Sequence, residues 1–300
     1  MKLHYSSGSF TKSVNNDWKI GVTKKPKLQN NPFLTDVREA MKSLPKLHLW
    51  WLGQSSFLIQ YQGKHLLLDP YLSDSLTKKY ENTNKPHVRM TERVIAPGAL
   101  DFIDVVTSSH NHTDHLDAET ILPLMQVNPE LKIVASKANL EFAANRLQVP
   151  LERLTPITQD KPVRLEPFTL HAVPAAHETL ETDEDGNHKF IGLMVEVGGY
   201  TIYHSGDTLL YDGMTNILKR WKIDVALLPI NGRDLSRGVA GNLSGEEAAG
   251  LAKDIGAKLV VGCHYDMFEF NTVSPKSFIE TAQRLGQPYR VLRNGERLSL

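Results

Sequence analysis

The stretch of sequence that decides the fold is Phe102-Ile-Asp-Val-Val-Thr-Ser-Ser109, which runs directly into His110-Asn-His-Thr-Asp-His115. The first eight residues are mostly apolar and rich in β-branched side chains, a pattern that predicts a buried strand. The next six place three imidazoles and one carboxylate in a loop at the end of that strand. Because α/β proteins build their sites where strands end, this stretch predicts an α/β protein with a functional site here.

Four metal-binding side chains lie in this loop, at His110, His112, Asp114 and His115. Residues two apart in an extended segment point the same way, so His110 and His112 can share one ion. The chain then turns, and Asp114 and His115 can serve a second ion beside the first. A lone pair of histidines is usually structural, but four such groups would be costly to bury without a partner. The sequence therefore predicts two divalent transition-metal ions; the ligand types suit Zn first, with Mn or Fe as alternatives.

Six residues cannot saturate two ions, so further ligands are expected at other strand ends. His177, Asp207 and His264 each follow an apolar run, as the first cluster does. Taken singly, His177 or His264 could equally be a core or rim histidine, but their shared position favours metal binding. The other histidines, His87 among them, are expected to be ordinary surface or packing residues.

Strand-like and helical runs alternate along most of the chain. The strand-like runs cover residues 47–52, 56–61, 64–69, 102–108, 131–135, 163–173, 189–197, 200–204, 224–228, 258–262 and 297–300. The helical runs cover residues 118–127, 139–147, 214–221 and 244–256, and a last helix begins near Ser274. Strands come first and alternating strands and helices follow, twice over, which predicts two sheets packed face to face with helices outside. No Gly-x-Gly-x-x-Gly follows the first strand, which argues against a nucleotide-binding doubly wound sheet.

Residues 1–46 are predicted to be an N-terminal extension, because this segment is polar and interrupted by prolines. A surface arm is the favoured interpretation, with an oligomer contact or a lid as the alternative. Residues 47–300 are predicted to form a single domain. Within it, residues 70–98 carry Pro, Asn and mixed charges, which indicates an insertion near the mouth of the site.

The composition is typical of a soluble globular protein. Among 300 residues, 34 Lys and Arg balance 34 Asp and Glu, which argues against binding of nucleic acid through bulk charge. Cys263 is the single cysteine and no apolar run approaches a membrane span, so a cytoplasmic protein is expected. The composition leaves a homo-oligomer open, and a small-molecule substrate is expected from the metal-binding motifs and the resemblance that they carry.

The order of the motifs resembles that of the metallo-β-lactamase-fold hydrolases. The shared pattern is His-x-His-x-Asp-His, then a distant His, then Gly-Asp, then a final strand-end His; Trp51–Phe57 and Leu66–Pro70 are similar to that superfamily's opening hairpin. The resemblance implies an α/β, four-layer αββα sandwich of two face-to-face mixed sheets with helices outside. It also implies these roles: one ion held by His110, His112 and His177, the other by Asp114, His115 and His264, Asp207 bridging, and Asp69 accepting a hydrogen bond from a ligand imidazole.

A narrower resemblance is to the L-ascorbate-6-phosphate lactonase branch. It rests on Tyr203-His-Ser-Gly-Asp-Thr208, Ile223-Asp-Val-Ala-Leu227, Arg237-Gly238 and His264-Tyr-Asp-Met-Phe268. It implies a metal-dependent hydrolase that attacks a lactone or ester, including a sugar-phosphate lactone. Two divalent ions can hold a hydroxide at neutral pH. Asp114 would be the catalytic residue, orienting the hydroxide and passing a proton to the leaving group.

Substrate-binding candidates lie in two loops. Asn231, Arg233 and Arg237 follow the strand at 224–228, and arginines there would suit an anionic substrate. Tyr265 and Asp266 follow the last ligand. The alternative for the arginines is an ordinary surface position, and the alternative for the residues after the last ligand is aromatic packing. Two other functions stay open: a phosphodiesterase acting on a cyclic nucleotide, phospholipid or nucleic-acid end, and a non-catalytic metal-binding scaffold.

Overall fold

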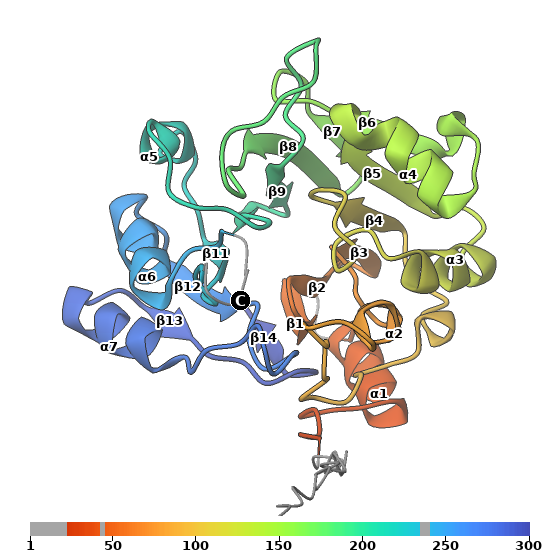
Figure 1. The fold of residues 1–300 in the computed structure, drawn as a ribbon, viewed down its shortest axis with the longest axis horizontal. Coiled ribbons are helices and arrows are strands. Elements are labelled where there is room, and N and C mark those ends of the chain that lie inside the picture. The colour runs from red at the N-terminus through yellow and green to blue at the C-terminus, as the bar shows by residue number, and fades with distance from the viewer. Residues whose placement is uncertain (1–22, 43–45, 235–240) are drawn as a thin grey trace, which may run out of the picture.

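Two sheets of seven strands each form the framework of the described residues (Figure 1). The computed structural model describes residues 23–42, 46–234 and 241–300. The first sheet has the order β14-β1-β2-β3-β4-β5-β6, and the second has the order β13-β12-β11-β10-β9-β8-β7. The strands of the first sheet, in chain order, are β1 (His48–Gly53), β2 (Ser56–Tyr61), β3 (Lys64–Leu68), β4 (Val105–Ser108), β5 (Lys132–Ser136), β6 (Leu154–Ile157) and β14 (Arg297–Ser299). Those of the second are β7 (Val163–Leu165), β8 (Phe168–Pro174), β9 (Ile191–Val197), β10 (Tyr200–His204), β11 (Val225–Pro229), β12 (Leu259–Cys263) and β13 (Tyr289–Arg290).

Both sheets are mixed, and both are built in the same way. β1, β2 and β3 pair antiparallel, whereas β3 to β6 pair parallel. In the second sheet β7 to β10 pair antiparallel, whereas β10 to β13 pair parallel. The helices connect the parallel strands, because a parallel pair requires a crossover. They are α3 (Ala118–Val127) and α4 (Leu140–Leu147) in the first sheet, and α5 (Met214–Leu218), α6 (Gly245–Asp254) and α7 (Lys276–Leu285) in the second.

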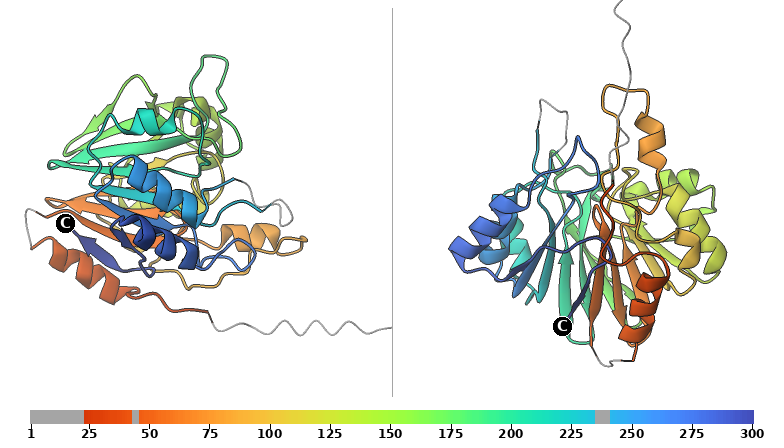
Figure 2. Two further views of the ribbon diagram at one scale, coloured as in Figure 1. Left: turned by 90° about the vertical axis from the view of Figure 1, so that its left-hand side faces the viewer. Right: turned by 90° about the horizontal axis from the view of Figure 1, so that it is seen from below.

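The helices cover the outer faces of the two sheets. Figure 2 shows α6 and α7, in blue, on one side and α3 and α4, in yellow-green, on the other, with the strands between them. One large buried cluster joins the two sheets with α6 and α7, and a second joins the first sheet with α1, α3 and α4. The predicted arrangement of two face-to-face mixed sheets with helices outside is therefore confirmed.

The alternation of side chains along β2 shows that the first sheet is buried on both faces, between the second sheet and the helices. Phe57 and Ile59 belong to the buried cluster shared with the second sheet, whereas Leu58 belongs to the cluster under the helices. Successive side chains of a strand point to opposite faces, so a strand that is buried on both faces needs an uninterrupted apolar run. This is the origin of the continuous hydrophobic stretches in the sequence.

Helix α1 (Asn31–Ala40) packs on the outer face of the first sheet, although it lies within the predicted extension. Phe33 and Val37 are buried, and Trp50 Nε1 donates a hydrogen bond to Asp36 Oδ2 at 2.8 Å. The helix begins at Asn31, because Pro32 in its first turn is compatible with a helix start. Residues 31–40 thus contribute to the core.

Several elements differ from the sequence prediction. The single strand expected over 163–173 is a hairpin, in which β7 and β8 are separated by Glu166 and Pro167. Strand β6 was not expected, because Pro156 interrupts it; a proline is tolerated here since β6 is at the edge of its sheet. Helix α2 (Ser75–Tyr80) lies within the predicted insertion. No helix in the part of the chain that the structure describes is long and apolar enough to cross a membrane.

Candidate metal centre

The ends of five strands bring the predicted ligands to one place. Strand β4 leads into His110–His115, and β8, β10 and β12 are followed by His177, Asp207 and His264. Strand β3 is followed by Asp69. Since β3, β4, β10 and β12 belong to the parallel parts of the two sheets, their carboxyl ends face the same edge. The two sheets therefore present their strand ends to each other across the site.

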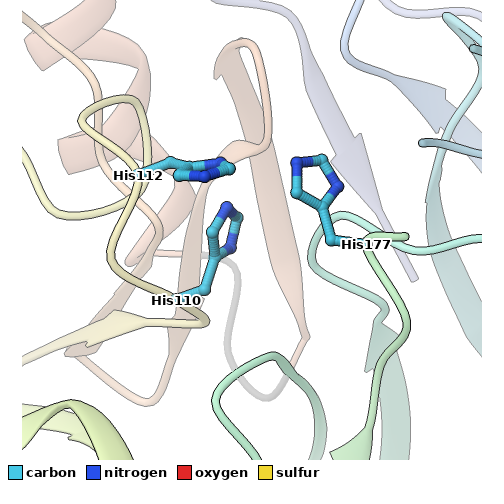
Figure 3. Close-up of side chains that lie close together, drawn as sticks. All are labelled: His110, His112 and His177. Atoms are coloured by element: carbon cyan, nitrogen blue, oxygen red, sulfur yellow. The ribbon is translucent and has the colours of Figure 1, made fainter. Parts of the chain in front are cut away.

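His110, His112 and His177 form the first group of potential ligands. One nitrogen from each lies within 4.8 Å of the others, and Figure 3 shows the three rings converging. His177 Nδ1 lies 2.9 Å from the carbonyl oxygen of Gly241 and can donate a hydrogen bond to it, which leaves Nε2 with its lone pair. Gly241 is required there, because a Cβ at this position would lie 2.3 Å from the carbonyl oxygen of His177.

Asp114, His115 and His264 form the second group, again with ligand atoms within 4.8 Å of one another. Asp114 Oδ2 lies 3.8 Å from His115 Nε2 and 3.6 Å from His264 Nε2. The residues that the resemblance assigns to each ion thus lie close together, and their assignment as ligands stays a prediction.

Asp207 lies between the two groups. Its Oδ2 atom is 3.4 Å from both His115 Nε2 and His264 Nε2, and the residue also forms a group with His110 and His115. Asp207 is therefore close to members of both groups, as a bridging ligand must be.

Asp69 orients two neighbours from behind the ligands. His115 Nδ1 lies 2.7 Å from Asp69 Oδ2, and Ser109 donates from its backbone N–H to Asp69 Oδ1 at 2.8 Å and from its hydroxyl to Oδ2. Asp69 is fully buried and has a φ of 41°, a left-handed conformation that Asp adopts more readily than most residues. The sequence placed this residue in a supporting role, and the geometry is consistent with it.

The charges of the site favour a cation. Burial alone would raise the pKa of Asp207, but His264 and His115 hold it well below its usual range. Burial lowers the pKa of His110 well below its usual value, and the neighbouring His115 lowers it further, so this imidazole is neutral and can act as a ligand. Buried Asp114 and Asp207 form their ion pairs, among the described residues, with histidines.

Two buried imidazole nitrogens show whether the site fits a metal ion. His110 Nε2 and His115 Nε2 are buried and have no hydrogen-bond partner among the described residues, although His115 Nε2 lies within ion-pair distance of Asp114 and Asp207. Buried polar atoms without a partner are rare because they are costly. Both atoms point to the groups that contain the other imidazoles and carboxylates, and this donor set suits a transition-metal ion. The residues present therefore fit the implied ions.

Gln54 belongs to the site, although the sequence analysis placed it only within the opening hairpin, Trp51–Phe57. Its Nε2 donates to Asp114 Oδ2 at 3.0 Å, and its carbonyl oxygen accepts from the backbone N–H of His264 at 3.0 Å and from Trp51 Nε1 at 2.8 Å. It is buried, with a φ of 46°. Its position directly after the apolar strand β1 was the sequence feature that could have identified it as a site residue.

A cavity of about 430 Å³ opens onto the ligands. This volume lies in the usual range for small-molecule pockets. Asp114, Asp207, His112, His177 and His264 form part of its lining. The other lining residues come mainly from three places: α2 and the turn after it, α4, and residues 268–271. The predicted insertion at 70–98 thus supplies one wall, including His87, which was expected to be an ordinary residue.

The structure describes four of the five predicted substrate residues, and none of these four lines the cavity. Arg233 is exposed and does not line the cavity, and Arg237 lies outside the described residues. Tyr265 is buried in the core, where its hydroxyl donates to the carbonyl of Leu292 at 2.6 Å. Asp266 forms an ion pair with Lys24 at 2.8 Å. Asn231 is buried and donates to Asn271 Oδ1 at 2.9 Å, so it reaches the cavity only through Asn271.

Comparisons with known proteins agree with this site. The sequence model of the Beta-lactamase superfamily domain matches residues 64–265, a range that contains every predicted ligand. A UPF0173 metal-dependent hydrolase of Sulfurisphaera tokodaii is 26% identical over 261 residues, which cover 86% of this chain and 100% of the relative. Another, from Methanoculleus marisnigri, is 31% identical over 243 residues, which cover 79% of this chain and 89% of the relative. The solved structure of a possible metal-dependent hydrolase from Veillonella parvula has a similar fold, with a TM-score of 0.68 at 17% identity over 85% of this chain and 100% of that one.

Proposed function

We propose, because the chain belongs to the β-lactamase superfamily and to its UPF0173 metal-dependent hydrolases, that it hydrolyses a small ester or lactone in the 430 Å³ cavity. The observation that carries this proposal is the position of Asp207 between two groups of ligands that both line the cavity. A metal-binding scaffold would not require its ligands to open onto a small-molecule pocket.

We propose two divalent ions, with Zn as the expected metal. His110, His112 and His177 would hold one ion, Asp114, His115 and His264 would hold the other, and Asp207 would contact both. Ions bound there would lower the pKa of a water molecule and polarise the oxygen of the scissile group. The hydrogen bonds at His115 Nδ1 and His177 Nδ1 fix which ring nitrogen of each imidazole is left to bind an ion.

Asp114 is the residue proposed to move the proton. Its contacts with Gln54, His115 and His264 all involve Oδ2, so Oδ1 is left to accept a proton from water and to pass it to the leaving oxygen. His115 and His264 keep the pKa of Asp114 low against the effect of burial, so the carboxylate is ionised before the reaction begins. The side chain is 16% exposed, which gives it access to the cavity.

The walls of the cavity favour a substrate with an apolar part. Leu76, Tyr80, Phe142, Phe268 and Phe270 all line it. Acyl chains and aromatic leaving groups can bury apolar surface against such walls. This is the reason for placing carboxylic esters and lactones ahead of phosphodiesters.

A hydrolysis screen tests the proposal. Purified protein loaded with Zn or Mn would be given γ-lactones, δ-lactones, 4-nitrophenyl esters, bis(4-nitrophenyl) phosphate and 4-nitrophenyl phosphate. We expect turnover of a lactone or ester, with about two ions per chain by elemental analysis. Turnover of the phosphodiester alone would replace the proposed substrate class, and turnover of none with a metal content near zero would overturn the function.

Two variants separate the metal from the proton transfer. Asp207→Ala should lose metal and activity together, whereas Asp212→Ala, a change of the same kind at an exposed position, should lose neither. Asp114→Asn should lower kcat by at least about a hundredfold, the usual range for a lost acid-base group, with a smaller loss of metal. An unchanged kcat for Asp114→Asn would remove the role given to Oδ1.

A further inference from the structure

We propose that Lys79 and Lys85 form an anion-binding subsite at the cavity mouth, which selects substrates that carry a carboxylate or phosphate group away from the bond that is hydrolysed. This inference rests on the proposed function, since it names the class of substrate for the same cavity. It places anion recognition on residues other than Arg233, one of the two arginines for which the sequence suggested it.

The two lysines lie on the same wall of the cavity. Lys79 is in α2 and Lys85 is in the turn that follows, and both line the pocket that contains Asp114 and Asp207. In Figure 2, α2 is the orange helix that stands outside the sheets at one end of the strands. Its position is fixed by hydrogen bonds from Ser75 Oγ to Asp117 Oδ1 at 2.9 Å and from Thr77 Oγ1 to the carbonyl oxygen of His87 at 2.8 Å.

Neither lysine is neutralised by a carboxylate in the described part of the chain. The neighbouring Lys78, by contrast, forms an ion pair with Glu119 at 2.8 Å. Lys79 Nζ instead lies 5.1 Å from the centroid of the Tyr80 ring, a cation-π distance. Two adjacent lysines on one short helix thus differ: Lys78 has a carboxylate partner, whereas Lys79, which lines the cavity, has none among the described residues.

The distribution of charge around the cavity supports an anionic ligand. Asp114 and Asp207 are the acidic residues of its lining, and both are engaged with histidines at the metal centre. Arg146 adds a third cation to the wall; its Nη1 donates to the carbonyl oxygens of Asn111 at 2.6 Å and Leu116 at 3.1 Å. Away from the metal centre, the charged residues of the lining are Lys79, Lys85 and Arg146, and such a group of cations attracts anionic ligands.

An aromatic wall belongs to the same side of the cavity as the two lysines. The His87 ring stacks on Tyr80 at 4.3 Å between centroids and meets the Phe270 ring edge-on at 4.3 Å and the Phe268 ring at 4.9 Å. These rings line the cavity together with the ligands. The substrate class is therefore an ester or lactone whose scissile group and anionic group are joined by an apolar segment.

Two chromogenic esters test the subsite. 4-Nitrophenyl hydrogen glutarate carries a carboxylate, and 4-nitrophenyl butyrate is a neutral ester of similar length. Metal-loaded wild type should prefer the glutarate, and each of Lys79→Ala and Lys85→Ala should lower the ratio of kcat/KM values, glutarate over butyrate, by about fivefold. Lys78→Ala is the matched control and should leave the ratio unchanged. Lys79→Arg should restore most of the preference, and 0.5 M NaCl should reduce it in wild type because salt screens exposed charges.

A binding measurement keeps the test independent of catalysis. Titration of the metal-loaded protein with glutarate or with inorganic phosphate, followed by calorimetry, should show weaker binding to Lys79→Ala/Lys85→Ala than to wild type or Lys78→Ala. The anion that binds with the higher affinity to wild type identifies the group, carboxylate or phosphate, that the subsite prefers. Equal affinities in the double variant and wild type, with an unchanged ester ratio, would overturn the subsite and leave the proposed hydrolase standing. A wild type that binds either anion through the lysines but hydrolyses no ester would instead overturn the proposed function alone.

Discussion

The Nδ1 atom of His115 lies 2.7 Å from Oδ2 of Asp69, and both side chains are fully buried behind the ligand cluster. The pair determines which nitrogen of His115 faces the cluster, because a ring that donates from Nδ1 keeps its lone pair on Nε2. Asp69 also accepts two hydrogen bonds from Ser109, the residue before the first ligand, so a single carboxylate orients the start and the end of the ligand loop.

Replacement of Asp69 by Asn should weaken metal binding while the fold is retained. The amide is the same size, but it can offer its NH₂ group to His115 and so favour the wrong tautomer. The expected loss is about tenfold to a hundredfold in metal affinity, typical for groups that support a ligand. Competition with a chelator, monitored by elemental analysis, measures it; Asp101→Asn, at an exposed position, is the control. An unchanged affinity would show that Asp69 does not set the tautomer.

Replacement of Gln54 by Leu should lower kcat by about tenfold, because the hydrogen bond to Asp114 Oδ2 is lost from a charged acceptor. Metal content should change little, since Gln54 is not among the proposed ligands. Gln62→Leu makes the same chemical change in the next hairpin turn, where the residue is exposed, and should leave kcat unaltered. If Gln54→Leu loses its metal as readily as Asp207→Ala, then Gln54 supports the ions rather than Asp114.

Truncation of Phe33 tests whether α1 is part of the folded domain. Phe33 is fully buried and lies edge-on to Trp50, with ring centroids 6.4 Å apart. Phe33→Ala should lower the free energy of unfolding by about 3–5 kcal/mol, as for other buried aromatic side chains. Urea denaturation provides the value, and Met41→Ala, at a position that is 37% exposed, should cost far less. A loss below 1 kcal/mol, by the same scale, would mean that α1 is only an extension.

The pH dependence of stability should contain a contribution from His65. Burial lowers its pKa to about 4, whereas an unfolded histidine titrates near 6.5. Below pH 6.5 the unfolded chain binds a proton that the folded protein excludes, so stability is lost as the pH falls from 6.5 to 4, by about 3 kcal/mol at pH 4. His65 Nε2 lies 2.8 Å from Gln60 Nε2, so the comparison variant is His65→Leu/Gln60→Leu, which removes both polar partners. Between pH 7 and pH 4, the free energy of unfolding should fall less for this variant than for wild type. An equal fall in the two proteins would exclude His65 as the cause.

The sequence was sufficient for the framework and for recognising the side chains that the structure brings together at the proposed metal centre, because both depend on local patterns. Helix α3 was expected over 118–127 and occupies Ala118–Val127, since Asp117 caps its first turn through the backbone N–H of Glu119. The strand-end position of His177, Asp207 and His264 could also be recognised from single segments. These residues meet because parallel strands end on the same edge, which is a property of the fold class.

The substrate-facing residues could not be found in the same way. Lys79, Lys85 and His87 reach the cavity only because the irregular segment at 70–98 follows a path that no local pattern encodes. Tyr265 looked like a cavity residue because it follows a ligand, but its ring packs on Trp51 at 4.6 Å between centroids and is turned into the core. Left-handed backbone at His264 and Asp266, with φ values of 62° and 56°, redirects the chain at this point.

The two ligand groups are each divided between the sheets. His110, His112, Asp114 and His115 follow a strand of the first sheet, whereas His177, Asp207 and His264 follow strands of the second. Neither sheet carries a complete group, so each bound ion would act as a clamp across the sandwich in a chain whose single cysteine can form no internal disulfide. A metal dissociation constant measured for this protein would therefore also report on how firmly its two layers of strands are held together.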